Sequence, residues 1–199
     1  MVTPTKKAAD VVHQELGVEA DSVEKLLHEH GWRWNHDGVW TRLNPGDADA
    51  ETGATYAGPT PGARLVRGER IVVDEAGMLD QDTALALLTV AGEPGASVAL
   101  VGDRAQLAAV GRGGVLDIAA ELSPRVFDMT TVHRFTDPDY AELTVRMHAG
   151  EHPALLFDRL QGCGLVMLHE STEALQEMIA HGAADGSAIT VATNDEGVR

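Results

Sequence analysis

The sequence predicts an α/β fold in which parallel sheets carry flanking helices. Two apolar runs, at 71–73 and 97–101, have the composition of strands buried on both faces of a parallel sheet. A helical pattern over 81–90 separates them, and strand, helix and strand at this spacing form one right-handed βαβ unit. The same order recurs near the C-terminus, with strands expected over 165–168 and 188–191 and a helix over 171–181. We therefore expect two α/β lobes.

Two helices are expected near the N-terminus. Apolar residues recur every three to four positions over 5–16, and Gly17 is a typical helix stop. The second helix begins after Asp21, which can form a capping box with Glu24. Further along the chain, helices are expected over 115–122 and 137–147, and a strand over 125–127.

An insertion occupies residues 32–68, between the second helix and the first long strand. Its first part predicts a hairpin over 32–42 that turns at Asp37 and Gly38. The rest, 43–68, is rich in Gly, Pro, Ala, Asp and Thr without periodicity, which predicts a long irregular loop. The three tryptophans of the hairpin have two interpretations, packing across the hairpin or stacking on bases, and packing is favoured.

The composition excludes several classes of protein. The chain has 199 residues, of which 44% are hydrophobic, so it is not disordered, and its single cysteine, Cys163, allows neither an internal disulfide nor a thiolate zinc site. No apolar run approaches the roughly 20 residues of a membrane helix, and the N-terminus lacks a signal-peptide pattern, so we expect a cytoplasmic protein. The net charge of −16 argues against a free-standing nucleic-acid binder.

The strongest local motif follows the strand at 71–73. Asp74 and Glu75 would emerge at the carboxyl end of that strand, where parallel sheets bind ligands. An ionised Asp at this position can hold Mg²⁺, and the adjacent Glu can orient or deprotonate an attacking water. Adjacent carboxylates also cap turns, so the motif alone leaves both interpretations open.

A second motif follows the strand at 97–101. Gly102 and Asp103 come directly after it, and Gln106 lies three positions further on. If the two strands are neighbours, Asp103 and Gln106 face the same crevice as Asp74. Gln106 has both a donor and an acceptor, which suits contact with a terminal phosphate or a catalytic water. A surface turn at Gly102 is the alternative.

Three further residue groups suggest contacts to phosphate. Arg134 lies near the expected lobe boundary, where a guanidinium can stabilise charge on a transferring phosphoryl group or form an interface salt bridge. Two similar turns precede helices, and they present hydroxyls and unpaired N–H groups that either seat a phosphate or cap the helix. These turns contain Thr3, Pro4, Thr5 and Lys6 in the first lobe and Thr193 and Asn194 in the second.

A phosphate-cradling loop of the form Gly-x-x-x-x-Gly-Lys-Ser/Thr is absent from the sequence. Only three lysines occur, Lys6, Lys7 and Lys25, and none follows a glycine. Such a loop normally precedes the other elements, and this sequence opens on what resembles the last residue of a strand. We therefore expect a fragment of a longer protein.

Taken in order, these segments resemble the superfamily 1 DNA helicases of the RecD-like branch, including the helicase portion of conjugative relaxases of the TraA/TraI type. The matching segments are 3–9 (motif Ia), 72–78 (motif II, the Walker B element), 100–114 (motif III and its continuation), 132–135 (motif IV) and 191–194 (a turn of the second motor lobe). The resemblance implies a RecA-like P-loop NTPase core that is truncated at both ends. Residues 1–132 would be part of the first motor domain, with the insertion, and 133–199 the start of the second.

The resemblance also implies roles for individual residues. Asp74 would hold Mg²⁺, Glu75 would activate water, Gln106 would couple the γ-phosphate to DNA and Arg134 would stabilise charge in the transition state. Gly102 and Asp103 would support the nucleotide site, and the two turns, with Thr3, Pro4, Thr5, Lys6, Thr193 and Asn194, would hold single-stranded DNA. ATP and Mg²⁺ are the implied cofactors, with the remaining motor segments of the parent chain as partners.

Two other interpretations stay open from the residues alone. One is a stand-alone Mg²⁺-dependent phosphohydrolase or nuclease, in which Asp74, Glu75 and Asp103 form a carboxylate cluster. The other is a non-catalytic interaction module derived from a motor. We expect negligible ATP hydrolysis by the isolated chain, because no loop holds the β-phosphate.

Overall fold

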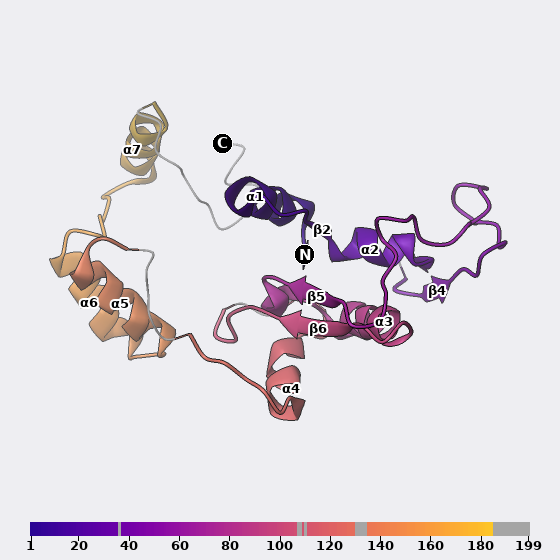
Figure 1. Cartoon of the computed structure of the whole chain (residues 1–199). Coiled ribbons are helices and arrows are strands. Elements are labelled where there is room, and N and C mark those ends of the chain that lie inside the picture. Colours follow the sequence, from indigo (N-terminus) through magenta and orange to yellow (C-terminus); the bar gives the residue numbers. More distant parts are fainter. Residues whose placement is uncertain (36, 107–108, 110, 130–134, 185–199) are drawn as a thin grey trace. The chain divides into compact units, whose positions relative to one another are not determined.

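The computed structural model describes residues 1–35, 37–106, 109, 111–129 and 135–184 (Figure 1). The chain divides into two compact units, Met1–Thr130 and Thr131–Arg199, which are considered separately below.

The first unit is built on a four-stranded parallel sheet. Its strands are β1 (Val2–Thr3), β2 (Asp21–Ser22), β5 (Arg70–Val73) and β6 (Ser97–Leu100), in the order β2-β1-β5-β6. The two longest strands pair along their whole length, from Arg70 opposite Ser97 to Val73 opposite Leu100. The predicted α/β fold with a parallel sheet and flanking helices is confirmed, and β2 is an addition that the sequence did not indicate.

Three of the four described helices of the first unit begin at a polar capping residue, and the fourth has Gly114 at that position. They are α1 (Lys6–Leu16), α2 (Val23–Glu29), α3 (Gln81–Gly92) and α4 (Val115–Leu122). Thr5 caps α1, and Gly17 ends it in the left-handed conformation that glycine adopts without strain. The predicted cap of α2 was wrong by one residue: the Ser22 hydroxyl accepts from the Lys25 amide, while Asp21 binds the Ser22 amide instead.

The hydrophobic core lies where α2 and α3 pack against β1 and β5. Its fully buried side chains include Leu27 from α2, Val73 from β5, and Leu87 and Val90 from α3. Burying a leucine or valine contributes about 1.5–3 kcal/mol, so this cluster accounts for much of the stability of the sheet. The core fixes the direction of β5 and therefore the position of the residues that follow it.

The insertion forms an antiparallel hairpin and an irregular loop. Strands β3 (Trp32–Trp34) and β4 (Trp40–Arg42) pair as predicted, with Trp34 opposite Trp40. The rings of these two residues lie 4.9 Å apart between centroids, so they pack across the hairpin. A short antiparallel bridge joins Ala48 and Thr55 within the loop at 43–68.

The described part of the second unit contains three helices and no strand. They are α5 (Pro138–His148), α6 (Pro153–Gly162) and α7 (Thr172–Ala184), and the buried side chains of Leu143 and Leu156 come from the first two. The strand predicted over 165–168 was wrong, because this apolar run has no neighbouring strand and Leu165, Met167 and Leu168 are exposed. The strand expected over 188–191 lies outside the described residues.

The structure also differs from the sequence predictions in two short segments. The strand predicted over 125–127 was also wrong, since those residues form no ladder and Phe127 is 87% exposed. Helix α6 was not predicted, although Pro153 stands at its first turn, where proline is favoured. Among the described residues, none of the helices has the length and apolar character needed to cross a membrane.

Candidate functional site

The turn after β5 presents two carboxylates at the edge of the sheet. Asp74 follows the last residue of the strand, and its Oδ1 accepts from the Glu75 amide at 3.0 Å. The Asp74 amide in turn donates to the Val2 carbonyl of β1, which fixes the turn to the neighbouring strand. Neither carboxylate has an ion-pair partner among the described residues, so both remain available to a ligand.

Glu75 has an unusual backbone conformation. Its φ angle is +53°, which makes it the only non-glycine residue with a positive φ in the described part of the chain. This left-handed conformation costs a residue with a Cβ roughly 1–2 kcal/mol. Such strain concentrates at functional sites, where the surrounding structure holds a side chain in a required direction. Here the following 3₁₀ turn, Ala76–Met78, is held by the bond from the Ala76 amide to the carbonyl of Val101, the residue after β6.

The turns after β5 and β6 are in direct contact. The Ala76 amide donates to the Val101 carbonyl at 2.8 Å, and the Val101 amide donates to the Val73 carbonyl. A Cβ at Gly102 would lie 3.0 Å from the Ala76 amide nitrogen, and a Cβ at Gly77 would lie 3.1 Å from the Asp103 carbonyl oxygen. Both positions therefore need glycine so that the two turns can touch.

Asp103 organises the turn after β6. Its Oδ1 accepts from the Ala105 amide at 2.9 Å, and its Oδ2 accepts from the Gln106 side-chain amide at 3.3 Å. Gln106 is thus tethered by the residue that lies against Gly77. Arg104 points elsewhere, to Asp117 and Asp128 at 3.9 and 3.8 Å, which places it outside the group of predicted site residues.

The N-terminal turn is built from Thr3 to Lys6. Thr3 is fully buried, and its hydroxyl donates to the Thr5 carbonyl at 2.7 Å, so it holds the turn together from inside. The Thr5 hydroxyl accepts from the Ala8 amide as the cap of α1. Pro4 and Lys6 are on the surface, and Lys6 pairs with Asp10 at 3.0 Å. The accessible groups of this turn are therefore Pro4, the exposed side of Thr5, and Lys6.

Three of the predicted site residues, Arg134, Thr193 and Asn194, lie outside the described residues. The structure thus brings together the candidates that follow β5 and β6. The turn after β1 joins them through the bond between the Asp74 amide and the Val2 carbonyl.

Among the described residues of the first unit, no strand pairs with the outer edge of the sheet beside these turns. Strand β6 is the edge strand, and although Val98, Ala99 and Leu100 form an apolar run, all three are half-exposed. Helix α4, which contacts the 3₁₀ turn, has no buried residue, and its Ile118 and Leu122 are exposed. Val98 and Leu100 pack against the core from one side, and the far edge of this strand has no described partner strand.

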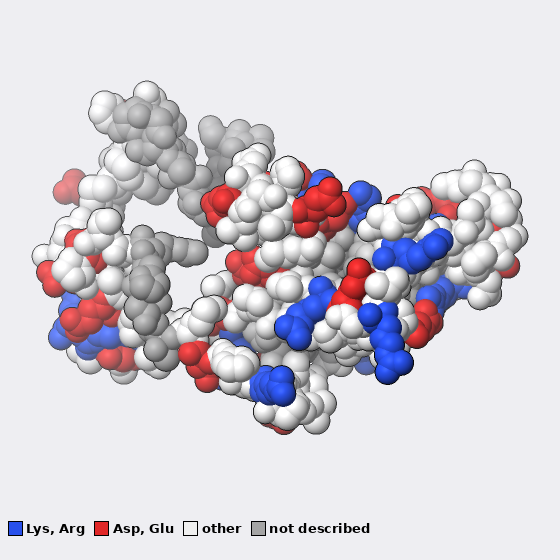
Figure 2. Space-filling model, in the orientation of Figure 1, with Lys and Arg blue, Asp and Glu red and all other residues white. Residues whose placement is uncertain are grey.

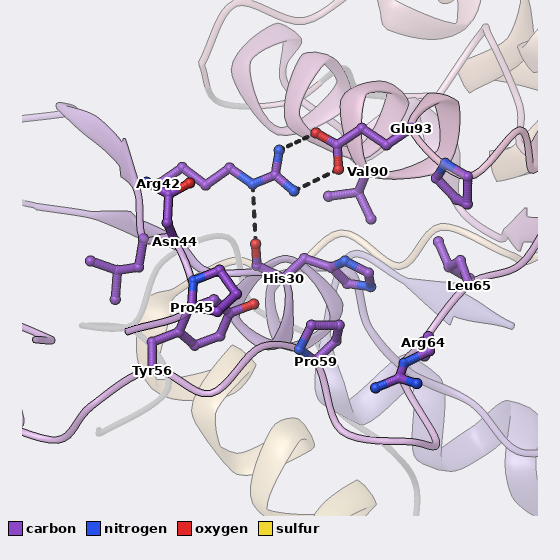
Figure 3. Close-up of a pocket in the computed structure, with 12 residues that line it drawn as sticks. His30, Arg42, Asn44, Pro45, Tyr56, Pro59, Arg64, Leu65, Val90 and Glu93 are labelled. Carbon is purple, nitrogen blue, oxygen red and sulfur yellow. Dashed lines mark hydrogen bonds and ion pairs between the residues drawn. The ribbon is translucent and has the colours of Figure 1, made fainter. Parts of the chain in front are cut away.

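A pocket that the sequence did not indicate lies at the opposite end of the strands. It has a volume of about 510 Å³ and is lined by the ends of α2, β4 and α3 together with the loop at 43–68. Figure 3 shows Arg42 reaching to Glu93, which pairs with it through both carboxylate oxygens, while the Arg42 Nε donates to the His30 carbonyl at 3.2 Å. Arg42 thereby binds the C-terminal ends of two helices, and no local sequence signal predicts a contact across 51 residues.

The loop at 43–68 is held by further buried contacts. Arg33 Nε donates to Asp49 at 2.7 Å in a largely buried ion pair, and the Arg33 guanidinium holds the pKa of that carboxyl below its ordinary value. The Tyr56 hydroxyl donates to the Glu29 carbonyl, and burial raises the Tyr56 pKa. Hydrogen bonds from Thr60 lower the pKa of Glu29. These contacts attach the loop at 43–68 to α2 and to the hairpin.

Comparison with known proteins identifies the family. The model of a family described as AAA domain matches residues 1–171, which is most of the chain. The chain belongs to this AAA domain family. The match includes the parallel sheet and both turns that carry the candidate residues.

Two curated proteins resemble the chain. Both are named RecBCD enzyme subunit RecD, from Mycobacterium tuberculosis strains CDC 1551 / Oshkosh and ATCC 25618 / H37Rv. Each is 37% identical over 127 residues, a region that covers 58% of this chain and 22% of the relative. The chain is therefore an AAA domain related to RecD, and the matching region spans about a fifth of the length of these relatives.

Proposed function

We propose that the chain is part of the motor of an ATP-dependent DNA helicase or translocase. The parent would be a longer protein of the conjugative relaxase or exonuclease V alpha-like kind. The observation that carries the proposal is the contact between the turns after β5 and β6, which gathers Asp74, Glu75, Asp103 and Gln106 at the carboxyl edge of a parallel sheet. The membership of the AAA domain family and the relation to RecD support it.

The residues of these turns fit ATP and Mg²⁺. Mg²⁺ is usually bound through one or two carboxylates plus waters and substrate phosphates, so one available carboxylate such as Asp74 is sufficient. Bound Mg²⁺ neutralises charge that develops on the phosphoryl group during transfer. Glu75, held at its strained φ, would orient and deprotonate the attacking water. Gln106 would sense the terminal phosphate through its side-chain amide, which Asp103 tethers.

A phosphate loop completes such a site, and we infer that the parent supplies it from a segment outside these residues. The sequence itself contains no Gly-x-x-x-x-Gly-Lys. The open edge of β6 and the uncovered face of α4 offer a place for the strand and helix that carry this loop, next to the candidate turns. A parallel strand added there would pair with the backbone of β6.

We propose that DNA contacts lie at the same edge of the sheet as the candidate ATP site. The turn after β1 presents Pro4, the Thr5 surface and Lys6, which can hold the backbone of a single strand. Because Thr3 is buried, we assign it the role of shaping this turn. Thr193 and Asn194 would provide an equivalent contact in the second lobe, and Arg134 would stabilise charge on the γ-phosphate.

The alternative of a stand-alone nuclease receives no support from the described residues. It requires a cluster of carboxylates that holds a metal without a nucleotide. In the described ranges, no group of three or more His, Cys, Asp or Glu side chains is arranged to hold a metal ion. The alternative of a decayed interaction module differs in one observable: its parent would lack the phosphate loop.

ATP turnover tests the proposal. The 199-residue chain should hydrolyse ATP at a negligible rate, whereas the parent with a phosphate loop should turn over at a rate that single-stranded DNA increases. Asp74→Asn in that parent should reduce turnover by about 100-fold, because the substitution removes the charged ligand of Mg²⁺. Steady hydrolysis by the isolated chain, or a parent in which Asp74→Asn hydrolyses ATP normally, would show that the proposal is wrong.

A further inference from the structure

Three arginines in an acidic chain lack acidic partners. Arg64, Arg67 and Arg70 are exposed, and none of them has a carboxylate within ion-pair distance among the described residues. Most other cations of the first unit are paired: Lys6, Lys25, Arg33, Arg42, Arg104 and Arg112 each contact an Asp or Glu. With 31 acidic residues in the chain, three unpaired neighbouring arginines indicate a local site for an external anion.

The three side chains are arranged around one turn. Arg64 lines the pocket beside Glu93 and Pro94, at the end of α3. The Cγ of Arg67 would lie 3.4 Å from a Cβ at Gly95, and the Nε of Arg70 donates to the Ser97 hydroxyl at 3.4 Å. Each arginine thus contacts or adjoins a successive part of the turn that joins α3 to β6. We call Arg64, Arg67 and Arg70 the arginine cluster.

The backbone that carries the arginine cluster is fixed. The Gly68 amide donates to the Gly95 carbonyl at 3.2 Å, and the Val66 amide donates to the Glu69 carboxylate at 2.8 Å. A fixed backbone means that binding does not have to order this loop, which lowers the entropy cost of binding. Figure 2 shows Lys and Arg side chains gathered over α2, α3 and the strands β5 and β6, with acidic groups between them.

We propose that the arginine cluster binds the phosphate backbone of DNA, at the end of the sheet opposite to the candidate ATP site. Arg70 and Ser97 begin the strands whose other ends carry Asp74 and Asp103, so this contact is separate from the turn that contains Lys6. The choice of DNA as the anion depends on the proposed motor function. A guanidinium group binds a phosphate through two parallel hydrogen bonds. Successive phosphates along a DNA strand can bind several guanidinium groups at once.

A phosphate backbone fits this surface better than a protein does. Protein interfaces have an apolar, often aromatic centre, yet Val66 is the only large hydrophobic residue that the segment 62–70 exposes. Phosphate contacts need little apolar area and depend mainly on charge and hydrogen bonds. The three arginines are exposed, so a phosphate can reach their guanidinium groups.

The test uses the 199-residue chain and labelled 20-nucleotide DNA, single-stranded and duplex, in anisotropy titrations at several salt concentrations. One variant replaces Arg64, Arg67 and Arg70 with Gln. A matched control replaces Arg112, Arg125 and Arg159, which lie outside the cluster, with Gln. It removes the same number of positive charges. We expect the cluster variant to bind about 10- to 100-fold more weakly at low salt and to lower the log–log salt slope by about 2–3, with little change in the control. Circular dichroism checks that each variant is folded.

Each result decides the inference. If both triple variants lose DNA affinity equally, the loss follows net charge and the inference is overturned. It is also overturned if wild-type chain does not bind DNA, or if the cluster variant binds as tightly as wild type. Retained DNA-stimulated ATP turnover by the parent in any of these cases would leave the motor function standing. Conversely, loss of DNA binding in the cluster variant together with a parent that never hydrolyses ATP would overturn only the motor function.

Discussion

The carboxylates after β5 and β6 and those around the insertion differ in their partners. At the carboxyl ends of β5 and β6, Asp74 and Glu75 have no ion-pair partner among the described residues. Around the insertion, Asp49 pairs with Arg33 and Glu93 with Arg42, and these cations lower the pKa of each carboxyl. The paired carboxylates hold the fold, while the unpaired ones lie beside a strained backbone and two close glycines.

The difference distinguishes carboxylates that stabilise the fold from those that we propose to bind a ligand. A buried ion pair must be complete to be tolerated, so its members are committed to each other. A carboxylate that is to bind Mg²⁺ must instead be left without a protein cation. The contrast predicts that substitutions in the turn after β5 change ATP turnover, whereas substitutions of the paired carboxylates change stability.

The largest effect should come from Glu75→Gln in the parent protein. The substitution removes the proposed general base and should lower ATP turnover by about 10²- to 10⁴-fold, without lowering the melting temperature. Steady-state turnover and thermal unfolding measure the two outcomes. Glu51→Gln, an exposed substitution in the insertion, serves as the control and should leave turnover unchanged. If the control were equally inactive, the distinction between the carboxylates after β5 and those of the insertion would be wrong.

Asp49→Ala should have the converse effect. It leaves the Arg33 guanidinium largely buried without its carboxylate, so the melting temperature of the 199-residue chain should fall by several degrees. Glu51→Ala, two residues away and exposed, should shift it by less than about one degree. Differential scanning fluorimetry compares the two. Similar melting temperatures would mean that the Arg33–Asp49 pair does not hold the loop.

Acid should weaken the insertion. Asp49, Glu29 and Glu93 have pKa values below their ordinary 3.8 and 4.5, because Arg33, Thr60 and Arg42 respectively stabilise the charged forms. The folded chain therefore binds fewer protons than the unfolded chain, and this stability is present above the ordinary pKa values and lost as the pH falls through the lowered ones. Urea midpoints between pH 7 and pH 3 should fall most steeply below about pH 4. Asp49→Asn should flatten that fall, and an unchanged profile would contradict the assignment.

The smallest expected effect concerns the backbone of Glu75. Because φ is +53°, Glu75→Gly should be more stable than Glu75→Ala by roughly 1 kcal/mol. At Glu142, in the middle of α5, the order should be reversed by a similar amount, since glycine weakens a helix interior. Chemical denaturation of the four variants measures both differences. The same order at both positions would show that Glu75 is not strained.

The sequence was sufficient to predict the parts of this structure that depend on local pattern. The apolar runs at 71–73 and 97–101 became β5 and β6, and their pairing placed the turn that follows Asp74 and Glu75 against Gly102. Capping was less certain, because Asp21 and Ser22 are both good caps and only tertiary structure selects Ser22. The apolar run at 165–168 looked like a strand, but a strand also requires a neighbour.

Contacts between distant residues could not be predicted. Arg33 and Asp49, or Arg42 and Glu93, meet only because the insertion folds back on α2 and α3. The burial of Thr3 likewise depends on the strands on both sides of β1. The strain at Glu75 arises because the 3₁₀ turn must meet β6, and nothing in its neighbouring residues indicates this.

Paramagnetic broadening by Mn²⁺ in the presence of ATP tests the central claim most directly. In the parent protein, with residues 1–199 isotopically labelled, Mn²⁺ replaces Mg²⁺ and broadens amide signals near the bound nucleotide. Signals from 74–77 and 102–103 should broaden together, while those from 47–56 in the insertion stay sharp. Broadening confined to the insertion, or to neither turn, would contradict the assignment of the two turns to one ATP site.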